Sequence, residues 1–334
     1  MPVCSAPGKI ILFGEHAVVF GKPALALAID MRITSSVSMS SDFAVNGHRM
    51  NKKYHSYISS ALDEAWGGPP ISVETSSKIP SGSGLGSSAA VTVSCVGAML
   101  AAKDEFDPEA IARKSFEVEF RVQGAASPTD TSVSSHGRGV IVSPEKMEGF
   151  LWTIEKGGRA WHVHDCEVPD LTFVVGYTGV HASTGPLVAK VRRLVESDPD
   201  ALAAMDRIGT IVMEGAEALV AADKARIGRL MDENHQLLNG LGVGLGLLDA
   251  LVSAAREHSY GAKLTGAGGG GSMIALTDSP DKVAAAIRHA GGTPFELRVG
   301  CEGVRVEKEG CPASRPARGG RKDKSVRGRQ HGGE

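Results

Sequence analysis

Residues 80–90 read PSGSGLGSSAA and lie between an alternating stretch, 71–79, and a long run of small and apolar residues that begins at Ser87 or Ser88. The alternation predicts a strand that Pro80 ends, and the small-residue run predicts a buried helix with serine as its N-cap. Glycine-rich backbone that leads into a helix N-terminus presents free N–H groups to an anion. We therefore interpret the stretch as an anion site rather than a flexible glycine–serine turn. It lacks the lysine of a G-x-x-x-x-G-K-[ST] loop, so a cation has to come from elsewhere.

Length and composition predict a globular protein of two domains or of one large domain, and we expect two. The chain has 334 residues, 42% of them hydrophobic and 22% charged, and a cluster of proline, aspartate and charge near 165–170 marks our expected boundary. Strands and helices mix without regular alternation, which predicts an α+β fold. Five cysteines without C-x-x-C spacing, and no apolar window of about 18 residues, predict a cytoplasmic protein without a membrane span.

The last residues, 311–334, differ from the rest. They hold seven Lys or Arg against two acidic residues and almost nothing apolar, so we expect a disordered basic tail. A solvated extension is favoured over contact with nucleic acid or an anionic surface.

Other motifs place charged residues at predicted element ends. An apolar strand is expected to end at Gly14, followed by a turn that presents Glu15 and His16. A helix is expected from Asp107–Pro108 to about Val122, and it brings Glu119 near a loop that carries Asp130. Helices are also expected over 183–197, 201–222 and 246–259. The alternative interpretation of each of these charged residues is that it lies at the protein surface, exposed to solvent, without a functional role.

Three further classes of site are excluded or disfavoured. Residues 266–271, GAGGGG, satisfy G-x-G-x-x-G, but a strand-like segment follows them where a dinucleotide fingerprint needs a helix. We expect a tight turn or a second loop that closes on phosphate or substrate. His162 and His164 are interpreted as surface histidines rather than zinc ligands, and no G-x-S-x-G elbow occurs.

Together, PGKIILFGEHAVVFG (6–20), PSGSGLGSSAA (80–90) and KLTGAGGGGS (263–272) resemble the three motifs of the GHMP superfamily, which comprises galactokinase, homoserine kinase, mevalonate kinase and phosphomevalonate kinase. The resemblance covers roughly residues 3–305. Lys9, the segment GEHAVV and Asp130 are most similar to the mevalonate kinases of the compact archaeal type. The resemblance implies an N-terminal domain like ribosomal protein S5 domain 2 over 1–168 and a ferredoxin-like C-terminal domain over 169–310.

Site residues also follow from the resemblance. Asp130 would be the catalytic base, with Lys9 beside the reacting hydroxyl; Ser88 and Glu119 would hold Mg²⁺. Glu15, His16, Thr178, Gly268 and Gly269 would contact substrate. The residues expected around the ATP phosphates are Pro80, Ser81, Gly82, Ser83, Gly84, Leu85, Gly86, Ser87, Ser88, Ala89 and Ala90.

The implied activity is transfer of the γ-phosphate of ATP to the primary hydroxyl of (R)-mevalonate, by a homodimer. Two alternatives stay open: a kinase of the same superfamily that acts on phosphomevalonate or a sugar, and a non-catalytic relative that binds a ligand. Intact Lys9, Ser88, Glu119 and Asp130 favour an enzyme, because a sensor needs neither a base nor metal ligands.

Overall fold

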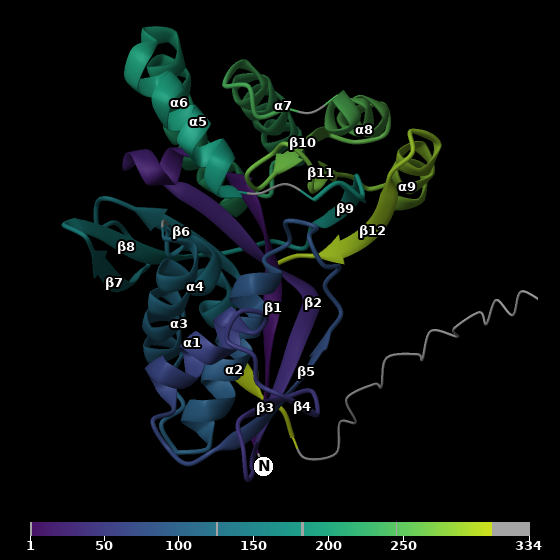
Figure 1. The fold of residues 1–334 in the computed structure, drawn as a ribbon. Coiled ribbons are helices and arrows are strands. Elements are labelled where there is room, and N and C mark those ends of the chain that lie inside the picture. Colours follow the sequence, from purple (N-terminus) through teal and green to yellow (C-terminus); the bar gives the residue numbers. More distant parts are fainter. Residues whose placement is uncertain (1, 125, 182–183, 245, 309–334) are drawn as a thin grey trace, which may run out of the picture.

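Two sheets organise the chain in the computed structural model, which describes residues 2–124, 126–181, 184–244 and 246–308 (Figure 1). The expected basic tail, 311–334, lies outside the described residues. The four described cysteines, Cys4, Cys95, Cys166 and Cys301, are free thiols. Helices and strands mix throughout, so the predicted α+β class is confirmed.

The first sheet is built around its two longest strands, β1 and β2, which pair antiparallel from Val3↔Ser36 to Phe13↔Leu25. The register shifts on each side of Lys9, between Pro7 and Lys9 and between Ile11 and Phe13. The strands of this sheet are β1 (Val3–Phe13), β2 (Ala24–Met39), β3 (Ala44–Val45), β4 (His48–Arg49), β5 (Ile71–Ser77), β6 (Gly139–Ser143), β7 (Phe150–Lys156), β8 (Arg159–Cys166) and β13 (Arg305–Val306).

A group of helices lies against this sheet. The helix α2 packs directly on β1 and β2, because its small and apolar residues leave almost no polar face. The helix α3 begins where predicted: the side chain of Asp107 accepts from the amide of Ala110, and Pro108 takes the first turn. The bounds are η1 (Ala17–Phe20, a 3₁₀ turn), α1 (Ser56–Ala65), α2 (Ser87–Ala101), α3 (Pro108–Gln123) and α4 (Thr129–His136).

The second sheet is antiparallel, with strand order β10-β11-β9-β12. Helices α8 and α9 contact it, and α7 packs on β10. Figure 1 shows α7, α8 and α9 around this sheet, with α6 beside α7 and α5 beside α6, all apart from α1–α4. Its elements are β9 (Thr172–Tyr177), α5 (Thr184–Ser197), α6 (Pro199–Val220), α7 (Lys224–Gly240), α8 (Gly246–Arg256), β10 (Gly261–Thr265), β11 (Ser272–Leu276), α9 (Pro280–His289) and β12 (Thr293–Arg298).

The two sheets share a hydrophobic core. One buried cluster contains Ile10 and Leu12 of β1 together with Phe173 of β9 and Ile211 of α6. The chain leaves the first sheet at the end of β8, close to the expected boundary at 168, and β13 later returns to pair with β1. The first sheet therefore includes residues from both ends of the described chain.

Several elements differ from expectation. The segment around Asp130 was expected to be a loop, but Thr129–His136 forms α4, which starts directly after Pro128. Three further long elements, β2, α1 and α7, were not predicted at all. The expected serine N-cap of α2 is wrong, since Gly86 occupies that position and no side chain caps the helix.

Among the described residues, no helix is both long and apolar enough to cross a membrane.

The contact between α7 and β10 generates a stability prediction. A Cβ at Gly228 would lie 2.1 Å from the carbonyl oxygen of Tyr260, and backbone cannot yield as a flexible side chain can. We expect Gly228→Ala to lower the free energy of unfolding by about 1–3 kcal/mol in chemical denaturation, because of overpacking. Gly240→Ala in the same helix is the matched control, as its Cβ would meet nothing within 4 Å. Equal stability of the two variants would contradict the prediction.

Candidate active site

The predicted phosphate loop connects β5 to α2 and is shaped by three glycines. Gly82, Gly84 and Gly86 have φ values of 72°, 78° and 78°, in the left-handed region that other residues rarely adopt. The backbone amides of 84–88 donate to no other group of the described chain. The loop thus ends at a helix N-terminus with several free N–H groups, which is the geometry of an anion site.

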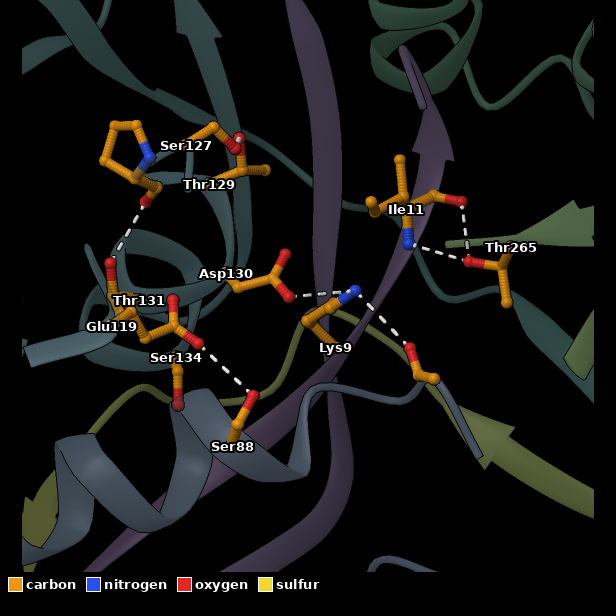
Figure 2. A network of polar contacts seen from close by, with 12 residues as sticks. Lys9, Ile11, Ser88, Glu119, Ser127, Thr129, Asp130, Thr131, Ser134 and Thr265 are labelled. Atoms are coloured by element: carbon orange, nitrogen blue, oxygen red, sulfur yellow. Dashed lines mark hydrogen bonds and ion pairs between the residues drawn. The ribbon is translucent and has the colours of Figure 1, made fainter. Parts of the chain in front are cut away.

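Lys9 supplies the cation that the loop lacks. Its side chain is 4% exposed, and its Nζ lies 3.1 Å from Oδ2 of Asp130 and 3.4 Å from the carbonyl oxygen of Gly84 (Figure 2). A Cβ at Gly86 would lie 2.8 Å from Cγ of Lys9, so the stem of the lysine lies against the loop. The ammonium of Lys9 therefore lies between the phosphate loop and Asp130, the predicted base. The side chain of Asp130 is 29% exposed.

The predicted metal ligands meet beside this pair. The hydroxyl of Ser88, in the first turn of α2, donates to Oε1 of Glu119 on α3 at 3.2 Å (Figure 2). Burial and the negative charge of Asp130 raise the pKa of Glu119 to about 8. A buried carboxylate with a hydroxyl beside it offers oxygen ligands to a hard cation, and a bound cation would favour the ionised carboxylate. The residues present therefore fit Mg²⁺.

Two neighbours of this pair were missed by the sequence analysis. Nε2 of Gln123 lies 3.1 Å from the hydroxyl oxygen of Tyr57 and 3.4 Å from Oε1 of Glu119. Gln123 is one helical turn beyond Glu119, and this i, i+4 spacing could have indicated the contact. Tyr57 comes from the unpredicted α1, so no local signal pointed to it.

Glu15 and His16 follow β1 in a turn that buries both. The carboxylate of Glu15 forms an ion pair with Lys263 of β10, and neither side chain is exposed. Nε2 of His16 lies 2.9 Å from the carbonyl oxygen of Ala267. Lys263, the first residue of the motif 263–272, lies inside β10, and its ammonium pairs with Glu15.

The second glycine loop connects β10 to β11 as an antiparallel hairpin, which agrees with the rejection of a dinucleotide fingerprint. Gly268 and Gly269 have φ values of 80° and 67°, and a Cβ at Gly268 would lie 2.2 Å from the carbonyl oxygen of Val243. The hydroxyl of Thr178 donates to the carbonyl oxygen of Gly271 at 2.8 Å. In the structure Thr178 thus supports this loop.

Direct hydrogen bonds connect the three sequence motifs. Oγ1 of Thr265 accepts from the amide of Ile11 at 3.0 Å and lies 3.1 Å from the carbonyl oxygen of the same residue (Figure 2). The hydroxyl of Ser272 donates to the carbonyl oxygen of Ser83 at 2.7 Å. Both ends of the second glycine loop are therefore tied, one to β1 and the other to the phosphate loop.

The prediction that His164 is a surface histidine is wrong. His164 is fully buried, and its Nε2 accepts from the amide of Met147 at 3.0 Å, so it is a structural residue rather than a surface one. Within the described ranges, no three His, Cys, Asp or Glu side chains form a group able to hold a metal ion.

Comparison with known proteins adds independent evidence. Residues 53–138 match the GHMP kinases N-terminal domain, and residues 216–293 match the GHMP kinases C-terminal domain. The mevalonate kinase of Pyrococcus abyssi is 40% identical over 92% of this chain and 98% of its own, and that of Thermococcus sibiricus is 39% identical over 91% and 98%. The crystal structure of the Methanococcus jannaschii mevalonate kinase matches with a TM-score of 0.75 at 26% identity, over 89% of this chain and 98% of that chain. The chain therefore belongs to the mevalonate kinases of the GHMP kinase family.

Proposed function

We propose that this chain transfers the γ-phosphate of ATP to the primary hydroxyl of (R)-mevalonate, giving 5-phosphomevalonate and ADP. The observation that carries the proposal is the position of the Lys9 ammonium between Asp130 and the phosphate loop, which brings a base and a nucleotide site together. The identity of about 40% to mevalonate kinases, over nearly the whole chain, supports mevalonate as the alcohol.

The reaction needs one proton acceptor and one stabiliser of negative charge. The substrate oxygen bonds to the γ-phosphorus while the bond from that phosphorus to the ADP oxygen breaks, and the hydroxyl proton passes to Asp130. Phosphoryl transfer proceeds through a loose transition state, so positioning and charge neutralisation account for most of the catalysis. Lys9 stabilises the developing alkoxide, because its ammonium lies beside the carboxylate that takes the proton.

The phosphates would be held by the loop and by a metal ion. The free amides of 84–88 would donate to phosphate oxygens at the start of α2, and Ser88 with Glu119 would hold Mg²⁺. When bound, Mg²⁺ neutralises phosphate charge; it usually takes one or two carboxylates from the protein and completes its shell with phosphates and water.

A cytoplasmic location is part of this proposal, and the four cysteines of the described residues support it because they are free, as is typical of reducing compartments. The alternatives are separated by one assay. ADP release should depend on mevalonate, and should be far slower with phosphomevalonate, galactose or homoserine. A comparable rate with another alcohol would reassign the substrate, and no release with any of them would favour a non-catalytic relative.

Asp130→Asn tests the base. We expect kcat to fall by roughly 10² to 10⁴-fold, the range for loss of a positioned general base, with little change in the KM for ATP. Steady-state kinetics of ADP release measure both quantities. Asp206→Asn, which breaks a surface pair with Lys22, is the control and should keep its activity. Near-normal turnover of Asp130→Asn would remove this residue from the mechanism.

Glu119→Gln tests the metal site. We expect the Mg²⁺ concentration that gives half-maximal rate to rise by about tenfold or more, because an amide oxygen carries no charge to hold the cation. The measurement is a Mg²⁺ titration of the rate at saturating ATP and mevalonate. Glu117→Gln on the same helix is the matched control, because Glu117 pairs with Lys156 at the surface. An identical Mg²⁺ requirement for both variants would leave Glu119 without a metal role.

A further inference from the structure

Tyr57 reaches the candidate metal site from α1, a helix that contains none of the three sequence motifs. The helix packs on α2 and α3, and Tyr57 lies in its first turn. The hydroxyl oxygen of Tyr57 accepts from Nε2 of Gln123, at the end of α3, at 3.1 Å. The ring of Tyr57 is half-buried, whereas Tyr54, three residues earlier, is 84% exposed. Of these two tyrosines, only Tyr57 is therefore held beside the site.

Gln123 connects this tyrosine to Glu119. The amide nitrogen of Gln123 carries two hydrogens, and its two acceptors are the hydroxyl oxygen of Tyr57 and, at 3.4 Å, Oε1 of Glu119. Ser88 donates to the same Oε1 at 3.2 Å (Figure 2), while Oε2 of Glu119 accepts from none of the described residues. With the amide of Gln123 turned over, its oxygen would face the carboxylate and repel it. The contact with Tyr57 therefore helps to keep the N–H groups of Gln123 directed at Glu119.

Tyr57 stays a neutral hydroxyl. Burial is the largest cause that raises the pKa of Tyr57; the hydrogen bond with Gln123 opposes it, and the charges of Glu119 and Asp130 raise the pKa further. The hydroxyl therefore keeps its proton near neutral pH. Since Mg²⁺ prefers carboxylate and phosphate oxygens, a neutral phenol is a poor ligand, and any effect of Tyr57 on the metal has to pass through its hydrogen bonds.

Other contacts hold α1 on α3. Arg121 donates to Oγ of Ser60 at 3.2 Å and to Oε2 of Glu64 at 2.9 Å. Lys114 donates to the carbonyl oxygen of Glu64 at 3.2 Å. Because these contacts do not involve Tyr57, the loss of its hydroxyl should leave α1 in place. The hydroxyl can therefore be tested separately from the packing of the helix.

We propose that Tyr57 is a positioning residue for the metal site: through Gln123 it orients the Glu119 carboxylate that would hold Mg²⁺. The inference rests on the proposed function, because the cation would be bound together with a nucleotide. Hydrogen bonds to a ligating carboxylate fix its orientation, and their removal usually lowers the affinity for the metal. The competing explanation is that Tyr57 only packs α1 against α3. Packing alone predicts lower stability without a selective effect on metal binding.

The test is Tyr57→Phe, which keeps the ring and removes the hydroxyl. Isothermal titration calorimetry gives the Kd for ADP, once with Mg²⁺ in excess and once with EDTA. We expect the Kd for Mg·ADP to rise roughly 3- to 10-fold, the loss expected for one hydrogen bond, and the Kd for ADP in EDTA to stay within about twofold. The Mg²⁺ concentration that gives half-maximal ADP release should rise by a similar factor. Tyr54→Phe is the matched control and should behave as the unchanged chain.

A double-mutant cycle tests the path through Gln123. Gln123→Met keeps the length of the side chain and removes the amide, so it should raise the Kd for Mg·ADP at least as much as Tyr57→Phe does. The double variant Tyr57→Phe/Gln123→Met should bind Mg·ADP no more weakly than Gln123→Met, because the hydroxyl has lost the group through which it acts. If Tyr57→Phe fails to fold, Gln123→Met decides alone: an unchanged Kd for Mg·ADP in that variant overturns the proposal.

The remaining outcomes are as follows. An unchanged Kd for Mg·ADP in Tyr57→Phe overturns the proposal. An equal rise with Mg²⁺ and with EDTA also overturns it, in favour of packing or of direct contact with the nucleotide. A double variant clearly weaker than Gln123→Met means that Tyr57 acts independently of Gln123, and an unchanged chain that gains no affinity for ADP from Mg²⁺ leaves Tyr57 no metal to serve; either result contradicts the proposal.

Failure of the proposed function has a different signature. The unchanged chain would then show no mevalonate-dependent ADP release. The calorimetric comparison needs no second substrate, so it would still test Tyr57.

Discussion

The burial of one ammonium group, that of Lys9, constrains most of the site. An isolated buried charge is strongly unfavourable, so the surrounding structure has to supply negative or dipolar partners within reach. Asp130 supplies a carboxylate at 3.1 Å, and the phosphate loop supplies the carbonyl of Gly84 at 3.4 Å. The stem of Lys9 in turn occupies the space where a side chain at Gly86 would stand, which explains why that position needs glycine for room as well as for its positive φ.

The strand that carries Lys9 is also where the rest of the site is assembled. Ile11 holds Thr265 through its backbone, and Glu15 and His16 hold Lys263 and Ala267 just beyond the strand end. These contacts join segments about 250 residues apart in the chain. The two sheets also share a hydrophobic core that includes Ile10 and Leu12, so the same strand carries site residues and joins the sheets.

Local signals in the sequence were sufficient for only part of this arrangement. The helix α3 was predicted because Asp107 and Pro108 form an N-terminal cap, and α2 because a long small-residue run follows glycines. The helix α4, which positions Asp130, has eight residues rich in serine and threonine, whose helix propensity is low, so tertiary contacts must select it. The pairing of Glu15 with Lys263 depends on how two sheets meet, and no sequence spacing encodes that. The site residues were named from motifs, whereas their geometry required the fold.

The position of Lys9 also bears on the metal. In a G-x-x-x-x-G-K-[ST] loop the lysine reaches the phosphates directly, whereas here the buried ammonium of Lys9 beside the loop pairs with Asp130. Burial first and the charge of Asp130 second raise the pKa of Glu119, while Ser88 and Lys9 act in the opposite direction. A cation held by Glu119 and Ser88 would favour the ionised form of this carboxylate. In the proposed reaction the two positive charges would then have separate tasks: Lys9 would serve the hydroxyl that reacts, and a bound metal ion would serve the phosphates.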